Sequence, residues 1–159
     1  MFKKAIVIGP PGAGKSTFSR ALRDLTQLPL FYLDMIAFKS DGSEISKDEF
    51  DTKLNEILKL KEWIIDGTYL RTLELRIKES DIIFFLDFPI ELCLLSAELR
   101  IGQEREDLPW EATEFDDEFK QYIINFPKDK LPKVYDLLNN YKCTKKLLLL
   151  NQETNQMNF

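Results

Sequence analysis

The sequence of 159 residues contains no histidine and only two cysteines, Cys93 and Cys143, which lie far apart. Without histidine or a close pair of cysteines, the common zinc-ligand patterns are excluded. A carboxylate, or the substrate itself, is then left as the general base of any acid–base reaction. Two isolated thiols are typical of a reducing compartment, where cysteine acts as a small core residue.

Long apolar runs and an excess of positive charge are absent as well. The longest apolar runs, such as residues 82–86, have the length of a strand and are too short to cross a membrane. The apolar run near Met1 ends at Gly9–Gly12, too early for a signal peptide. With 22 basic and 27 acidic residues, the formal net charge of −5 disfavours direct binding to nucleic acid. We therefore expect a cytoplasmic protein without a membrane or nucleic-acid partner.

Short β-rich runs alternate with helical patterns along the whole chain, and no repeat or linker interrupts them, so we expect one domain over residues 1–159. The predicted strands are 4–8, 28–33, 63–66, 81–87 and 146–150, and the predicted helices are 14–25, 46–60, 72–79, 90–101, 114–125 and 131–140. Phe126–Pro127 is expected to break the chain between the last two helices. This order predicts an α/β fold in three layers, with a five-stranded parallel sheet between helices.

A glycine-rich loop between the first strand and the first helix matches the phosphate-binding pattern G-x-x-x-x-G-K-[ST]. Its residues are Gly9, Pro10, Pro11, Gly12, Ala13, Gly14, Lys15, Ser16 and Thr17. The glycines allow backbone N–H groups to surround phosphate oxygens, and the helix N-terminus adds its positive dipole end. Lys15 is predicted to reach the β- and γ-phosphates of ATP, and the Ser16 hydroxyl to bind Mg²⁺. The loop and its context predict a P-loop NTPase fold.

Three aspartates, Asp34, Asp66 and Asp87, are expected to close predicted strands. Ligands of parallel α/β sheets bind at the carboxyl ends of the strands, so these side chains are candidate site residues. Asp87 is interpreted as the second carboxylate on the Mg²⁺ side. Asp34 could accept the proton of an acceptor hydroxyl, whereas a nucleotide kinase would need no such base. It could equally be a helix or turn cap.

Several segments together resemble the adenylate-kinase-like proteins known as the DNA topology modulation (FlaR-related) family, over nearly the whole chain. The segments are the glycine loop, Tyr32–Asp34, Trp63–Tyr69, Phe85–Pro89, Glu118–Phe119 and Asn125–Phe126. The resemblance implies a nucleoside-monophosphate-kinase fold that binds ATP and Mg²⁺, with an acceptor that the family name does not identify. The segment 66–72 is also similar to the Asp-Gly-Phe-Pro-Arg-Thr segment of adenylate kinases, although it is one residue longer here.

This second similarity implies that Arg71 grips the phosphate of the acceptor, with Asp66 and Gly67 beside it and Arg76 able to join it. A guanidinium suits this function because its planar fork can bond two phosphate oxygens at once. For Arg76 alone, a solvated helix face is the preferred interpretation.

The charged stretch that follows the helix 90–101 is a candidate lid, with bounds at residues 102–113. In kinases of this type, lid arginines close over the γ-phosphate and neutralise the charge that develops during transfer. Arg100 and Arg105 are the candidates. The alternative is an exposed loop in which Glu104, Glu106 and Asp107 pair with these arginines.

Together these features predict a phosphotransferase that moves the γ-phosphoryl group of ATP·Mg²⁺ to a small acceptor, as a monomer or a dimer. The predicted catalytic residues are Lys15, Asp34, Arg100 and Arg105. Arg71 favours a nucleoside monophosphate as the acceptor, which is the preferred prediction, and Asp34 favours a hydroxyl of a small metabolite. A non-catalytic nucleotide-binding regulator linked to DNA topology is the remaining alternative.

Overall fold

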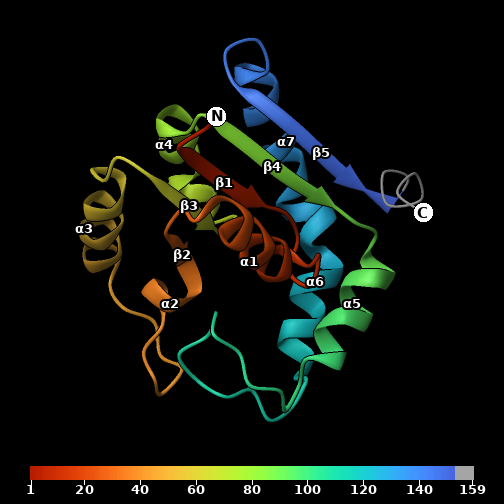
Figure 1. The fold of residues 1–159 in the computed structure, drawn as a ribbon. Coiled ribbons are helices and arrows are strands. Elements are labelled where there is room, and N and C mark those ends of the chain that lie inside the picture. Colours follow the sequence, from red (N-terminus) through yellow and green to blue (C-terminus); the bar gives the residue numbers. More distant parts are fainter. Residues whose placement is uncertain (153–159) are drawn as a thin grey trace.

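The computed structural model describes residues 1–152, and within them five parallel strands form one sheet between layers of helices (Figure 1). The strands are β1 (Lys4–Ile8), β2 (Leu30–Tyr32), β3 (Trp63–Asp66), β4 (Ile82–Asp87) and β5 (Lys146–Asn151). The helices are α1 (Lys15–Thr26), α2 (Leu33–Ala37), α3 (Lys47–Leu58), α4 (Leu70–Glu79), α5 (Ile90–Leu99), α6 (Asp117–Asp129) and α7 (Leu131–Tyr141). The strand order is β2-β3-β1-β4-β5, which confirms the predicted α/β fold.

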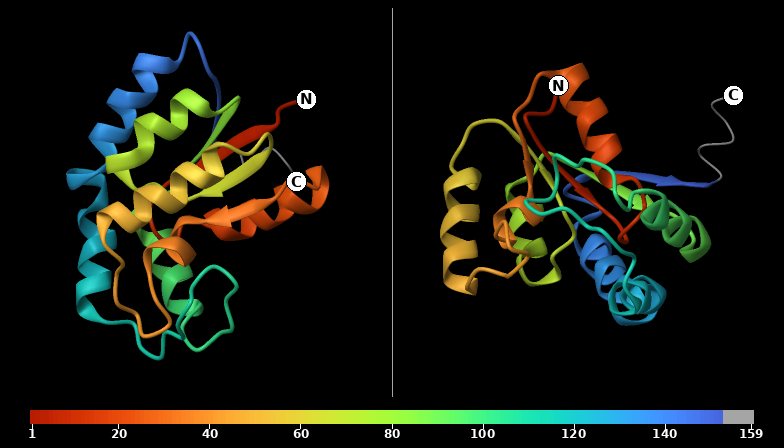
Figure 2. Two further views of the ribbon diagram at one scale, coloured as in Figure 1. Left: turned by 90° about the vertical axis from the view of Figure 1, so that its left-hand side faces the viewer. Right: turned by 90° about the horizontal axis from the view of Figure 1, so that it is seen from below.

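Successive residues of the central strands face opposite layers of helices, as the pleat of a strand requires. Ala5 and Val7 of β1 pack on the side of α1, together with Phe18 of that helix. Ile6 and Ile8 pack on the opposite side, with buried residues of α2, α3, α4 and α7. Figure 2 shows α1 and α7 on opposite sides of the sheet. Because both faces are covered, the strands are almost continuously apolar.

A smaller apolar cluster packs α5 and α6 against the glycine loop. Its buried residues are Cys93 and Ala97 of α5 and Ile123 of α6, and Ala13 of the loop packs against them. This cluster fixes the start of α5 beside the phosphate-binding motif.

The structure overturns two details of the predicted elements. The second strand ends at Tyr32, and Leu33 begins the short helix α2, so Asp34 lies in the first turn of a helix rather than at the end of a strand. Pro127 does not break the chain, because α6 continues through it to Asp129. Proline removes one backbone hydrogen bond, but the burial of Phe126 beside it holds the helix in place. The helix ends before Pro132, near the start of α7.

An irregular segment, residues 100–116, joins α5 to α6 and contains the predicted lid. It crosses from α5 toward α2 and returns to α6 (Figure 1). A backbone hydrogen bond of 3.0 Å from the N–H of Gly102 to the carbonyl of Ala112 closes it into a loop. The Trp110 ring lies edge-on to Phe38, just after α2, with 4.8 Å between ring centroids. Within the described residues, no helix combines the length and apolar character needed to span a bilayer.

Candidate active site

The glycine loop is shaped by the close approach of other backbone segments. A Cβ atom on Gly9 would lie 2.4 Å from the carbonyl oxygen of Leu86, and one on Gly12 would lie 2.2 Å from that of Cys93. Both glycines also have positive φ angles, 151° and 80°, which side chains rarely tolerate. Helix α1 begins directly after the loop, so the free N–H groups of its first turn point to the same place. The loop can therefore receive an anionic phosphate.

Thr68 ties the loop to the neighbouring strand end, and sequence reasoning had not singled it out. Its hydroxyl accepts a hydrogen bond from the Gly9 N–H at 3.1 Å and donates one to the Gly9 carbonyl at 2.6 Å. The next residue back, Gly67, donates its N–H to the carbonyl of Val7 at 3.0 Å. The signal in the sequence was a threonine directly after the Asp66–Gly67 pair at the end of a strand.

Lys15 is half-buried and interacts electrostatically with two of the predicted carboxylates, Asp66 and Asp34. Its ammonium group donates a hydrogen bond of 2.9 Å to the carbonyl of Pro10. Burial lowers the pKa of Lys15, while the charges of Asp66 and Asp34 act in the opposite direction. The structure therefore brings together Lys15, Asp34 and Asp66, which come from three different elements.

The two carboxylates differ in their partners. Burial raises the pKa of Asp66 to about 6, although Lys15 and a 3.0 Å hydrogen bond from the Ser19 hydroxyl favour its ionised form. Burial also raises the pKa of Asp34, and the hydroxyl of Tyr69 donates to Asp34 Oδ1 at 2.6 Å. Carboxyl groups with raised pKa values near a lysine are typical of functional sites.

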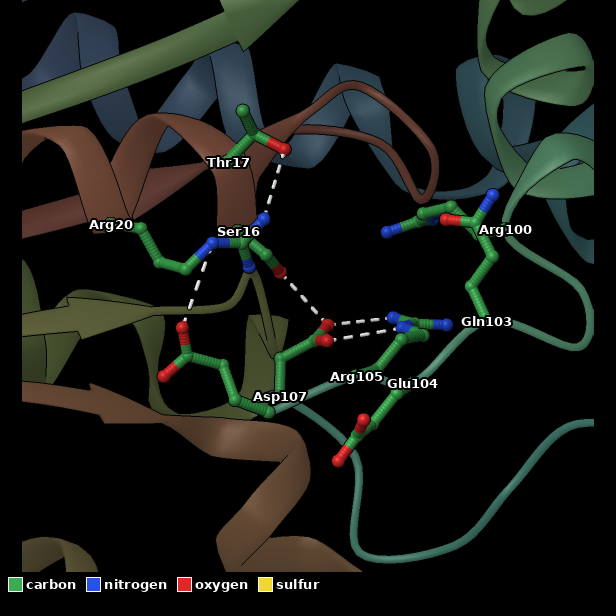
Figure 3. A pocket seen from close by; sticks show the side chains of 9 residues that line it. Ser16, Thr17, Arg20, Arg100, Gln103, Glu104, Arg105 and Asp107 are labelled. Carbon is green, nitrogen blue, oxygen red and sulfur yellow. Dashed lines mark hydrogen bonds and ion pairs between the residues drawn. The ribbon is translucent and has the colours of Figure 1, made fainter.

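A pocket of about 520 Å³ opens between the start of α1 and the irregular segment (Figure 3). It is lined by Ser16, Thr17, Arg20, Arg100, Gln103, Glu104, Arg105, Glu106 and Asp107. Three arginines and three acidic residues line it, and two of the arginines, Arg20 and Arg105, are paired with Glu106 and Asp107. Burial lowers the pKa of Arg100, whose Nε is buried and has no hydrogen-bond partner within the described residues.

Asp107 lies inside this pocket and joins it to the glycine loop. Its carboxylate accepts a hydrogen bond of 2.8 Å from the Ser16 hydroxyl and two from Arg105, at 3.0 and 2.6 Å (Figure 3). These contacts lower the pKa of Asp107 even though its side chain is buried. The alternative to a lid was an exposed loop whose acidic residues pair with its arginines. Arg105 and Asp107 form such a pair, but Asp107 is buried and the Arg105 side chain is mostly covered.

Asp87, the predicted carboxylate on the metal side, lies at the end of β4 as expected, and its side chain has a partner on α7. The hydroxyl of Tyr135 donates to its carboxylate. In β4, Asp87 lies on the same side of the sheet as Phe85, which packs against α7. Asp66 of β3 lies on the opposite side, toward α1, and accepts a hydrogen bond from the hydroxyl of Ser19. The structure thus brings Asp66, and not Asp87, to the helix that carries Lys15 and Ser16.

The two predicted acceptor arginines lie apart from this cluster. Arg71 forms a two-pronged ion pair with Asp51 of α3, at 3.0 and 2.8 Å, on an exposed surface. Arg76 is fully buried, which corrects the expectation of a solvated helix face. Its guanidinium donates to the backbone carbonyls of Gly67, Thr68 and Tyr69. A guanidinium held in this way supports the loop instead of facing a ligand.

This architecture, a parallel sheet with a P-loop after its first strand, is the α/β fold of small P-loop kinases. The solved structure of shikimate kinase from Acinetobacter baumannii in complex with shikimate superposes with a TM-score of 0.61 at 18% identity, over 97% of this chain and 87% of that one. A sugar kinase from Janibacter sp. gives 0.56 at 15% identity, over 99% and 90%. These likenesses show the fold.

Curated relatives match shorter parts of the chain. A shikimate kinase from Rhodococcus jostii is 45% identical over 47 residues, and an adenylate kinase from Thermotoga maritima is 28% identical over 81 residues. The matches cover 30% and 51% of this chain, and only 28% and 36% of the length of those relatives. No protein-family model matches the chain. These relatives support a P-loop kinase-like protein.

Proposed function

We propose that this protein is an ATP-dependent kinase that transfers the γ-phosphoryl group to a hydroxyl of a small metabolite. The observation that carries the proposal is the half-buried carboxylate of Asp34, which interacts electrostatically with Lys15 and accepts a hydrogen bond from Tyr69. In a chain without histidine, a half-buried carboxylate near the phosphate-binding loop is the group best suited to receive a proton.

The charge at this place argues against a phosphate acceptor, which was the preferred prediction from the sequence. Asp34 and Asp66 would repel the phosphate of a nucleoside monophosphate, whereas a hydroxyl is neutral and donates a hydrogen bond to a carboxylate. The arginine expected to offset that repulsion, Arg71, is paired with Asp51. Arg76 is held by backbone carbonyls.

The transfer then follows from the positions of these groups. The acceptor oxygen forms a bond to the γ-phosphorus, the bond from that phosphorus to the bridging oxygen breaks, and its electron pair leaves with ADP. The proton of the acceptor hydroxyl passes to Asp34. Lys15 orients the β- and γ-phosphates, and Arg100, whose Nε has no hydrogen-bond partner within residues 1–152, neutralises the charge that spreads over the transferring group. Arg105 joins Arg100 when its ion pair with Asp107 opens.

The residues around the start of α1 fit a bound Mg²⁺. The Ser16 hydroxyl and the Asp66 carboxylate offer the oxygen ligands that this ion prefers. Within residues 1–152 no group of three or more histidine, cysteine, aspartate or glutamate side chains could hold a metal ion, so Mg²⁺ would share its ligands with phosphates and water. When bound with ATP, it supplies positive charge to the phosphate oxygens.

A nucleoside-monophosphate kinase is the second candidate, because the Thermotoga adenylate kinase matches half of the chain. Both candidates are tested by measuring coupled ADP release with two panels of acceptors, hydroxylated metabolites (sugars, polyols and hydroxy acids) and nucleoside monophosphates. We expect at least one hydroxylated compound to raise turnover well above the rate with ATP alone. Stimulation by nucleoside monophosphates alone would select the second candidate, and no stimulation by either panel would contradict a kinase function.

A further inference from the structure

Tyr69 has a backbone conformation that is rare for a residue with a side chain. It immediately precedes α4, and its φ and ψ angles are 35° and 76°, in the left-handed region. Outside glycine, asparagine and aspartate, such a conformation costs about 1–3 kcal/mol and persists only where surrounding contacts enforce it. Strain of this kind clusters at functional sites, so the contacts that hold Tyr69 are informative.

Arg76 holds the backbone of this strained residue. Its guanidinium, fully buried, donates to the carbonyls of Gly67 at 2.7 Å and Tyr69 at 3.1 Å, and also to that of Thr68. Burying this charge is costly, and it is balanced by backbone oxygens instead of a carboxylate partner. These hydrogen bonds hold the backbone of residues 67–69 in the conformation seen here.

The aromatic ring of Tyr69 is fixed as well. It stacks on Phe50 of α3, with ring centroids 5.4 Å apart and planes inclined by 18°. With both backbone and ring held, the hydroxyl reaches Asp34 Oδ1 at 2.6 Å, a short distance typical of a hydrogen bond to a carboxylate. Within residues 1–152, no other side chain donates a hydrogen bond to this carboxylate.

We propose that Tyr69 is the positioning residue for Asp34: its hydroxyl fixes one carboxylate oxygen and stabilises the ionised form, so that the other oxygen faces the hydroxyl of the acceptor. The assignment of the acceptor rests on the proposed function, whereas the effect of Tyr69 on Asp34 does not. Without the phenol, burial would favour the protonated carboxyl group, which cannot accept a proton.

Other charged and titratable groups also act on Asp34, and the test must separate Tyr69 from them. They are Lys15 on α1, Asp66 at the end of β3, Arg100, Arg105 and Asp107 on the segment 100–116, and Tyr122 on α6. A substitution that removes only the Tyr69 hydroxyl leaves all of these groups in the protein.

The test is a pH titration of the Asp34 carboxyl carbon by ¹³C NMR on the intact protein, assigned with Asp34→Asn. In Tyr69→Phe, which keeps the ring on Phe50, we expect the pKa of Asp34 to rise by about one unit. The matched control is Tyr141→Phe, which removes a tyrosine hydroxyl bonded to Glu74 at 2.8 Å on the surface. We expect the control to leave the pKa of Asp34 unchanged.

An unchanged pKa of Asp34 in Tyr69→Phe, or an equal rise in the control, would overturn the proposal. If Tyr69→Phe fails to fold, 3-fluorotyrosine at position 69 replaces it, because this more acidic phenol is a stronger donor and should lower the pKa of Asp34. The titration needs no acceptor, so it decides about Tyr69 even if the proposed function fails. With an active acceptor, the acid limb of the pH profile of kcat/KM should shift to higher pH in Tyr69→Phe, in step with the rise in the pKa of Asp34.

Discussion

The hydroxyl of Ser16 donates a hydrogen bond of 2.8 Å to the carboxylate of Asp107, 91 residues further along the chain. Ser16 belongs to the phosphate-binding loop, and Asp107 belongs to the segment that joins α5 to α6. The same carboxylate is held by Arg105. A buried anion of the protein thus lies beside the loop that receives phosphate, so binding of a nucleotide is expected to break this bond.

The first prediction concerns this contact. Asp107→Asn removes the negative charge from the pocket and weakens the bond to Ser16, so ATP should bind more tightly. Hydrogen bonds to charged groups contribute about 1.5–3 kcal/mol, and the lower end of this range corresponds to roughly a tenfold lower Kd for ATP. Titration calorimetry without and with Mg²⁺ measures this change.

Glu106→Gln is the comparison variant for that experiment. Glu106 lines the same pocket, but its carboxylate pairs with Arg20 at 3.6 Å and Arg23 at 3.2 Å, on an exposed surface. Such pairs are worth little, so we expect less than about a threefold change in Kd. Weaker binding of ATP by Asp107→Asn in the presence of Mg²⁺ would indicate that Asp107 binds the metal, against our account.

The second prediction separates the two acceptor classes at Arg71. Because its guanidinium pairs with Asp51 on an exposed surface of α3, Arg71→Ala should change the KM for a hydroxylated acceptor by less than about twofold, and it should change stability very little. Steady-state kinetics and urea unfolding provide these values. A large rise in KM would place Arg71 at the acceptor and would favour the nucleoside-monophosphate kinase.

The third prediction follows from the pKa of Asp66, which burial raises to about 6 from an ordinary value of 3.8. Between these two values the folded protein binds a proton at this site that the unfolded chain does not. This group therefore makes the free energy of unfolding decrease as the pH rises from about 4 to about 6.

Asp66→Asn removes this dependence, so the variant should gain stability relative to the wild type between pH 4.5 and pH 7. The pKa difference sets an upper limit of about 3 kcal/mol on that relative gain. Urea unfolding of both proteins at both pH values measures it. The account of Asp66 is contradicted if the stability difference between the two proteins is the same at pH 4.5 and pH 7.

The fourth prediction concerns the buried guanidinium of Arg76. Arg76→Lys keeps the positive charge, but a single ammonium group cannot reproduce the fork that reaches the carbonyls of Gly67, Thr68 and Tyr69. We expect a loss of about 1–3 kcal/mol in the free energy of unfolding. Arg23→Lys, at an exposed ion pair with Asp24, is the matched control and should cost much less. Equal losses would show that Arg76 has no special function in the loop.

The sequence was sufficient to predict the sheet and the glycine loop, because both depend on local patterns. Continuous apolar runs define buried parallel strands, and the strand–loop–helix context defines the P-loop. The start of the predicted helix 46–60 was also right, because Ser46 caps α3 and accepts a hydrogen bond from the N–H of Glu49 at 3.1 Å.

The sequence could not show toward which side of the sheet each strand residue points, so the positions of the carboxylates could not be predicted. In a sheet buried on both sides, alternation between apolar and polar residues is lost, so nothing in the sequence shows that Asp66 faces α1 while Asp87 faces α7. The contact of Asp107 with Ser16 depends on the path of an irregular loop, which has no periodic pattern. Arg76 did leave a signal, because it lies three residues after Leu73 on the buried stripe of α4.

The most direct test of the account is to follow ³²P from γ-labelled ATP to the best hydroxylated acceptor, with the wild type and with Asp34→Asn under the same conditions. The account predicts labelled acceptor with the wild type and a rate at least about 100-fold lower in the variant, since general-base catalysis contributes about 10²–10⁴-fold. ATP affinity should stay within a few-fold of the wild-type value. Label that appears only on nucleoside monophosphates or in free phosphate, or an Asp34→Asn protein that transfers label at the wild-type rate, would contradict it.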